Sequence, residues 1–161
     1  MNVNIFQTTQ EPIIWPFRYT TIVNLICTTF KKNGRANFGN TPLHLAARRG
    51  YKKIFQLIFE NIEEKNPKCS NSWTPLHFAA ENGHFELCKL ILSQIQEKNP
   101  KNVFDWTPLH SAAKNGHFKV CQLILRYVKK INLKDSFGRT PLKLAKTYRH
   151  SELIDLFSSH K

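Results

Sequence analysis

Thr41-Pro42-Leu43-His44 recurs as Thr74-Pro75-Leu76-His77 and as Thr107-Pro108-Leu109-His110, and each copy begins 33 residues after the last. Thr140-Pro141-Leu142-Lys143 continues the spacing with one change. A fixed period of this length indicates one supersecondary unit stacked on copies of itself. Stacked units form an extended surface rather than a closed pocket, and extended surfaces bind partners.

The period extends well beyond these four residues. Paired alanines and then a glycine follow each complete motif, at 46–47 and 50, at 79–80 and 83, and at 112–113 and 116. An asparagine followed two residues later by a base recurs in the same register, at Asn33, Asn66, Asn99 and Asn132. With four copies in register, residues 33–161 resemble the ankyrin-repeat family. The resemblance implies an all-α solenoid of helix-turn-helix units with hairpin-like loops.

Each unit is also interpretable from its residues alone. Thr followed by Pro is a helix start, because the hydroxyl caps a free backbone N–H and Pro suits the first helical position. The glycine after the alanines ends this helix in a left-handed turn. A second helix follows, with apolar residues at helical spacing. These are Ile54, Leu57, Ile58 and Ile62, then Leu87, Leu90, Ile91 and Ile95, then Val120, Leu123, Ile124 and Val128.

The register predicts how the chain is divided. Residues 33–65, 66–98 and 99–131 are three repeats, and residues 132–161 are a carboxyl-terminal capping repeat, because a base replaces the expected His, Ala and Gly. Residues 1–32 form a degenerate amino-terminal capping unit, with residues 10–32 as its repeat-like part. A cut from a longer repeat array is the alternative for this end. We expect the domain to end where the chain ends.

The net charge of +13, from 24 bases and 11 acids, is uneven along the chain. Ten bases lie between Lys114 and Arg149, where Asp135 is the single acid. A solvated, solubilising face and steering toward an acidic partner surface both account for this charge. Nucleic acid is the less favoured partner, because no helix-turn-helix, zinc-finger or RNP motif is present.

The cysteine and hydropathy patterns indicate in which cellular compartment the protein is expected. Cys88 and Cys121 lie one period apart on the second helices, where they are predicted to be small buried hydrophobes. Equivalent positions of stacked repeats are too far apart for a disulfide, so a reducing compartment, cytosol or nucleus, is expected. No apolar run is long enough for a membrane span, and a monomer is expected.

No catalytic or metal site is expected, and no cofactor. His44, His77 and His110 repeat once per unit, which is typical of a scaffold, and each is predicted to hydrogen-bond near its Thr cap. The Cys–His spacing of a zinc site does not occur. The acids are scattered, and no glycine-rich phosphate loop is present.

The resemblance places partner contacts on the loops and at the ends of the first helices. Its variable contact positions fall on Phe38, Asn40, Arg48, Arg49, Asn71, Trp73, Glu81, Asn82, Phe104, Trp106, Lys114, Asn115, Phe137, Arg139 and Tyr148. Aromatic residues beside Arg are typical of binding hot spots. We therefore interpret Trp73 and Trp106 as binding residues. For the phenylalanines, partner binding and sideways packing against adjacent loops remain equal alternatives.

Three classes of function follow. The favoured class is a non-catalytic module whose concave groove binds a protein partner with an acidic surface. Within this class, a short chain made only of repeats resembles inhibitors of the IκB-like type. The second class is an adaptor that brings a client to a larger complex. The third is charge-driven binding of nucleic acid, which steep salt dependence would reveal.

Overall fold

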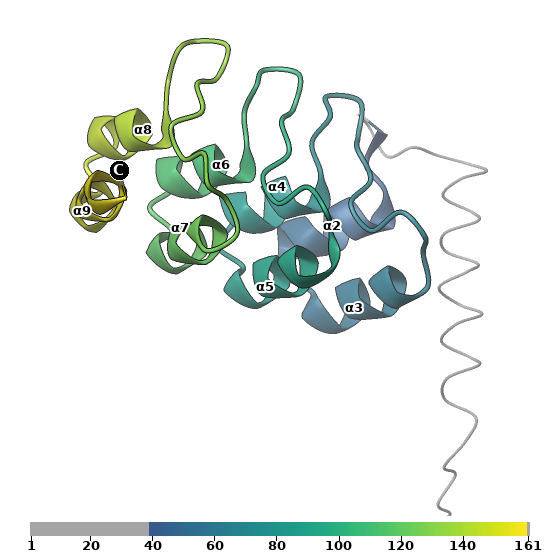
Figure 1. The fold of residues 1–161 in the computed structure, drawn as a ribbon. Coiled ribbons are helices and arrows are strands. Elements are labelled where there is room, and N and C mark those ends of the chain that lie inside the picture. The colour runs from purple at the N-terminus through teal and green to yellow at the C-terminus, as the bar shows by residue number, and fades with distance from the viewer. Residues whose placement is uncertain (1–38, 161) are drawn as a thin grey trace, which may run out of the picture.

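The computed structural model describes residues 39–160 and shows eight helices in that range. They follow one another as four pairs (Figure 1): α2 (Pro42–Arg49) and α3 (Lys52–Glu60), α4 (Pro75–Glu81) and α5 (Phe85–Gln94), α6 (Pro108–Lys114) and α7 (Phe118–Leu125), α8 (Pro141–Thr147) and α9 (Ser151–Ser159). The first helices of the pairs stack in one row and the second helices in another. Hairpin-like loops project beyond the row of first helices. The predicted all-α repeat solenoid is confirmed.

Each first helix begins as the Thr-Pro pair predicts. Thr74 is extended, with φ −114° and ψ 164°, and Pro75 occupies the first helical turn. The backbone N–H of Thr74 donates to Nδ1 of His77 at 3.1 Å, and the Thr74 hydroxyl lies 2.9 Å from the same nitrogen. The expected hydrogen bond between the His and its Thr cap is confirmed.

The same histidine also joins its unit to the next one. Nε2 of His77 lies 3.1 Å from the carbonyl oxygen of Trp106, the residue before the following Thr cap. His44 bonds the carbonyl of Trp73 at 3.0 Å, and His110 that of Arg139 at 3.1 Å. Because Nδ1 accepts from a backbone N–H, the proton sits on Nε2 and each ring is neutral. Burial lowers the pKa of His77 to about 4, which keeps it in this form.

A second histidine in each later unit bonds in the opposite direction along the stack. Nε2 of His117 donates to the carbonyl of Glu81 at 2.9 Å, and His84 and His150 make the same bond to Arg48 and Lys114. These rings lie over the glycines that end the first helices. A Cβ added to Gly83 would come within 2.6 Å of the His117 ring. Glycine is therefore required for close approach as well as for its φ of +71°.

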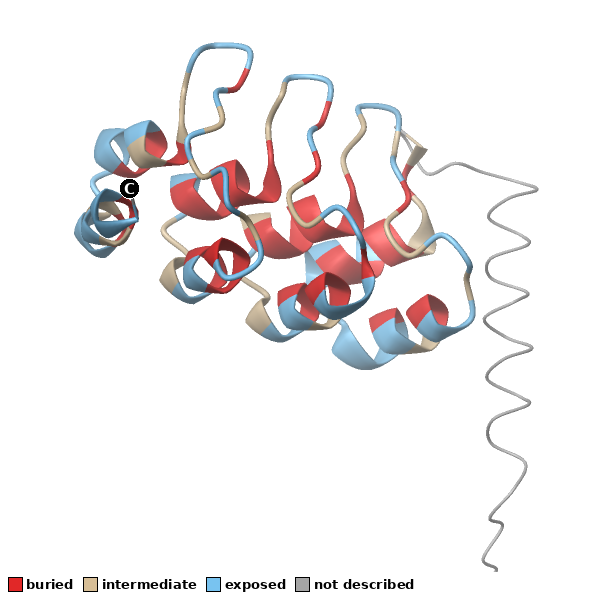
Figure 2. Ribbon diagram, viewed as in Figure 1, coloured by how far each residue is buried: buried red, intermediate tan, exposed pale blue. Residues whose placement is uncertain are grey.

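The core lies between the two rows of helices (Figure 2). Paired alanines on the first helices are buried, which lets neighbouring units approach closely. Cys88 and Cys121 are fully buried on the second helices, as predicted. Burial raises the pKa of Cys88 to about 12, so this thiol stays protonated and unreactive.

The first described pair differs from the later pairs in which side chains it buries. Ile54 is 53% exposed, although its equivalents Leu87 and Val120 are buried. Phe55, Ile58 and Phe59 supply the buried face of α3. Among the described residues a helix pair precedes α5 and α7, whereas none precedes α3 and its partner α2.

The amino-terminal capping unit and the boundaries of the units are two further predictions. The capping unit assigned to residues 1–32 falls outside the described residues, and the unit boundaries remain predictions. Within residues 39–160, no helix combines the length and the apolar character that a bilayer crossing requires.

The contact between glycine and histidine gives a matched stability test. Gly138 has the same φ of +71° as Gly83, but nothing lies within 4 Å of its added Cβ. We expect Gly138→Ala to lower the free energy of unfolding by about 1 kcal/mol, the backbone cost alone. Gly83→Ala must also displace the His117 ring, so we expect about 2–3 kcal/mol. Urea denaturation measures both, and equal losses would contradict the packing role of the ring.

Candidate partner-binding surface

The described residues among the predicted contacts lie on the loops and at the carboxyl ends of the first helices. We use the name loop-side face for these parts together, namely the loops and the carboxyl ends of α2, α4 and α6 (Figure 1). Its exposed side chains include Arg48, Arg49, Asn71, Asn82, Val103, Phe104, Lys114, Asn115 and Phe137, with Tyr148 after α8. Asn40 is only 9% exposed, so its assignment to a contact surface is corrected. Phe38 lies outside the described residues.

The tryptophans are half-buried and pack onto their own units. The Trp73 ring lies 5.1 Å from the Phe78 ring and 5.3 Å from that of His77, between ring centroids. Trp106 donates its indole N–H to the hydroxyl of Ser111 at 2.7 Å. These contacts hold the base of each loop against the first helix that follows it. Much of each ring therefore serves packing, and the interpretation of Trp73 and Trp106 as binding residues stays a prediction.

The loop phenylalanines are more open than the tryptophans. Phe137 is 69% exposed and Phe104 is 49% exposed, and their neighbour Val103 is 53% exposed. The backbone N–H of Ser136 donates to the carbonyl of Phe104 at 2.9 Å, so the two loop tips lie side by side. Sideways burial against adjacent loops, the alternative for these residues, does not describe Phe104 or Phe137.

The loop before α6 is held by a buried amide. Asn102 Oδ1 accepts from the backbone N–H of Phe104 at 2.8 Å and from that of Trp106 at 3.0 Å. Asn102 N–H also donates to the Trp106 carbonyl at 2.9 Å. Asp105, between them, adopts a φ of +55°. One side chain therefore fixes both sides of this tight turn.

The loop before α8 uses a buried carboxylate in the same way. Asp135 Oδ1 accepts from the N–H groups of Phe137 at 3.0 Å and Arg139 at 2.7 Å, and Oδ2 lies 2.7 Å from the Arg139 guanidinium. Burial acts to raise the pKa of Asp135, but the hydrogen bonds from Arg139 and Phe137 outweigh it and leave this pKa below its usual value. The Arg139 guanidinium lies 4.8 Å from the Phe137 ring centroid and 5.2 Å from that of Trp106.

These two buried groups were missed as candidate site residues. Asn102 and Asp135 lie one period apart at the start of a loop, and an Asn or Asp in that place predicts a side chain that bonds backbone two residues on. Cys69 occupies the equivalent place in the loop before α4 and cannot form the same strong bonds. The tip of that loop carries Ser70 and Asn71.

Several residues at the helix ends of this face form hydrogen bonds or ring contacts with other residues of the chain. The amide of Asn82 donates to the Phe78 carbonyl and that of Asn115 to the Ser111 carbonyl, both at 2.9 Å. The Arg48 guanidinium carbon lies 4.4 Å from the Phe78 ring centroid. Among the described residues, none of the ion pairs includes Arg48, Arg49 or Lys114. No acid therefore compensates their positive charge by an ion pair within the described residues.

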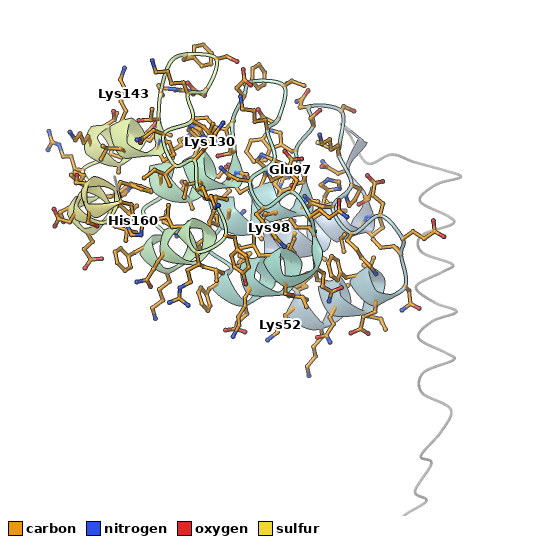
Figure 3. The ribbon with its side chains drawn as sticks, viewed as in Figure 1. Lys52, Glu97, Lys98, Lys130, Lys143 and His160 are labelled. Carbon is orange, nitrogen blue, oxygen red and sulfur yellow. The ribbon has the colours of Figure 1, made fainter. Side chains whose placement is uncertain are left out.

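The bases of the capping pair belong to a different surface. Lys143 and Lys146 occupy the positions of buried His110 and Ala113, and both are exposed because no described pair follows α8. Lys143 extends outward at the α8 end of the stack (Figure 3). Arg149 replaces the turn glycine with a φ of +59°. Part of the positive charge of residues 114–149 therefore covers the end of the stack, as in a solvated cap.

Within residues 39–160 no group of His, Cys, Asp and Glu is placed to hold a metal ion. A surface hollow of about 440 Å³ lies where the segment after α7 meets the end of α9. Lys129, Lys130 and His160 line it together with apolar residues, and Lys130 and His160 are labelled in Figure 3. The side chains that the described residues make available for contact with a partner are aromatic and basic.

Stacked helix pairs with projecting loops define a helical-repeat protein. Comparison with family models matches the ankyrin repeats model, which spans three copies, over residues 17–102 and again over 94–161. The chain therefore belongs to the ankyrin-repeat family, whose members are generally protein–protein interaction modules. A comparison with curated proteins finds no match.

The division between packed and exposed aromatics is directly testable. We expect Trp73→Ala to lower the free energy of unfolding by about 2 kcal/mol, because it removes a half-buried ring that packs on Phe78. Phe137→Ala removes an exposed ring and should change this free energy by less than about 0.5 kcal/mol. Thermal denaturation of the two variants checks the contrast. A larger loss for Phe137→Ala would show that the exposed assignment is wrong.

Proposed function

We propose that the chain is a non-catalytic module that binds an acidic protein partner through its loop-side face. The observation that carries the proposal is the pairing of exposed aromatics with bases that lack an ion-pair partner on that face. Phe104 and Phe137 supply apolar area at the loop tips. Arg49 and Lys114 supply charge at the ends of the first helices. Aromatic and Arg side chains together are the usual composition of strong contact sites.

Electrostatics supports an acidic rather than a neutral partner. The chain carries a net charge of +13, and Arg48, Arg49 and Lys114 on this face take part in none of the ion pairs among the described residues. Such a surface accelerates encounter with an acidic one and repels basic competitors. A partner bound here would have its own contact surface shielded, which is how an inhibitor of the IκB-like type acts.

Nucleic acid is the alternative that the charge alone would allow. Backbone recognition needs bases that track a phosphate chain, and it is strongly weakened by salt. On the loop-side face the bases alternate with Glu81 and with amides that bond their own helices. That alternation favours a protein surface with mixed contacts.

The proposal is tested by reversing charge on two different faces. We expect Arg49→Glu combined with Lys114→Glu to weaken partner capture from a cell extract at least about tenfold at roughly 0.15 M salt. Lys53→Glu combined with Lys119→Glu makes the same charge change on α3 and α7 and should leave capture intact. Quantitative mass spectrometry of the captured proteins gives the readout.

Two outcomes would contradict the proposed function. One is capture that nuclease treatment abolishes, because it would identify nucleic acid as the ligand. The other is an equal loss in both charge-reversal variants, because it would show that net charge and not this face governs binding. Circular dichroism of each variant establishes that the fold is retained.

A further inference from the structure

The tips of the two loops that precede α6 and α8 form one apolar ridge. We define the loop-tip ridge as Val103, Phe104 and Phe137, which are respectively 53%, 49% and 69% exposed. Backbone hydrogen bonds connect successive loops here. Ser136 N–H donates to the Phe104 carbonyl at 2.9 Å, and Val103 N–H donates to the Asn71 carbonyl at 3.2 Å. Apolar side chains this exposed contribute little to the free energy of folding. When a partner covers them, the burial of their apolar area favours binding.

Buried side chains hold the backbone of both loops that carry the ridge. Asn102 and Asp135 are buried, and each accepts two backbone N–H groups from its own loop. Arg139 adds a guanidinium over the Phe137 ring and is itself held by Asp135. A surface that is already ordered loses little conformational entropy on binding, so more of its contact energy appears as affinity.

The internal comparison between loops strengthens this interpretation. The two loops with a buried Asn or Asp are the two whose tips carry exposed aromatics. The loop before α4 has Cys69 in that place and polar residues at its tip. A brace needed only for folding would be equally useful in all three loops. Its coincidence with the exposed rings therefore points to a role in presenting those rings.

Charge defines what surrounds the apolar contact. The acids of the two loops are already paired, Asp105 with Lys101 at 2.8 Å and Asp135 with Arg139 at 2.7 Å. Lys134 at the base of the second of these loops is exposed and has no acid partner among the described residues. Because these pairs cancel, Lys134 gives the rim of the ridge a net positive charge.

We infer that the loop-tip ridge is the apolar anchor of the binding surface, and that it takes an acidic protein segment whose apolar side chains contact Phe104 and Phe137 while its carboxylates face the basic rim. The inference rests on the proposed function and deepens it by assigning the anchor to the loop tips. It differs from the sequence-based expectation, in which the tryptophans carry this role.

The test uses a random peptide library displayed on phage and selected on the full chain at low salt. We expect the enriched peptides to combine large apolar residues with two or more Asp or Glu residues. Synthetic copies should bind the Phe104→Ala/Phe137→Ala variant at least tenfold more weakly than the native chain. Tyr51→Ala/Tyr127→Ala is the matched control, because it removes two exposed aromatics outside the ridge and should bind as the native chain does.

Each other outcome overturns the inference. Failure to enrich peptides, enrichment without acidic residues, or equal binding to the Phe104→Ala/Phe137→Ala variant would show that the ridge is not the anchor. The Arg49→Glu/Lys114→Glu variant separates this failure from that of the proposed function. If peptide binding is lost in that variant but kept without the two phenylalanines, the loop-side face binds and the ridge does not anchor. If all variants bind alike, both proposals fail.

Discussion

The neutral imidazole that spans two units is the interaction on which the rest of this structure depends. Its Nδ1 accepts a backbone N–H from the Thr cap of its own unit, and its Nε2 donates to a carbonyl of the next. That carbonyl belongs to the residue that ends a loop and precedes the next helix start. One ring therefore sets a helix start, the spacing between units and the root of the following loop. Losing the proton at Nε2, or gaining one at Nδ1, would break one of these bonds in a buried place, where an unpaired polar group is costly.

The binding surface follows from this scaffold in two layers. The half-buried Trp73 and Trp106 attach the loop bases to the stack through ring contacts and an indole hydrogen bond. Farther out, buried Asn102 and Asp135 organise the turns. The outermost side chains can then be chosen for contact alone, because neither the cap nor the core depends on them. This separation explains how a strictly periodic protein carries different residues at its loop tips.

Much of the fold could be predicted because its signals are local. A Thr-Pro pair marks a helix start by capping chemistry, a left-handed turn favours glycine, and a 33-residue period places every copy in register. The cap role of the histidines also followed from spacing within one motif. Their bonds to the next unit did not, because spacing along a chain does not show which carbonyl of a neighbouring unit lies within reach.

The site was harder to predict than the fold, because exposure depends on neighbours. Trp73 and Phe104 both occupy variable loop positions. Only the structure shows that the Trp73 ring is half-buried, because it packs against Phe78. Asn40 looks like a surface amide in the sequence and is buried in the structure. Ile54 has the helical spacing of a core residue but is exposed, whereas Leu87 and Val120 at the same place in the next two pairs are buried.

The most direct test of the central claim is the protonation state of His44, His77 and His110. Long-range ¹H–¹⁵N correlation spectroscopy distinguishes a proton on Nε2 from one on Nδ1 and from a charged ring. Neutral rings protonated on Nε2 are predicted for all three at pH 7, and His77 should stay so at pH 5 because burial lowers its pKa to about 4. Protonation on Nδ1, or a charged His77 at pH 5, would contradict the account.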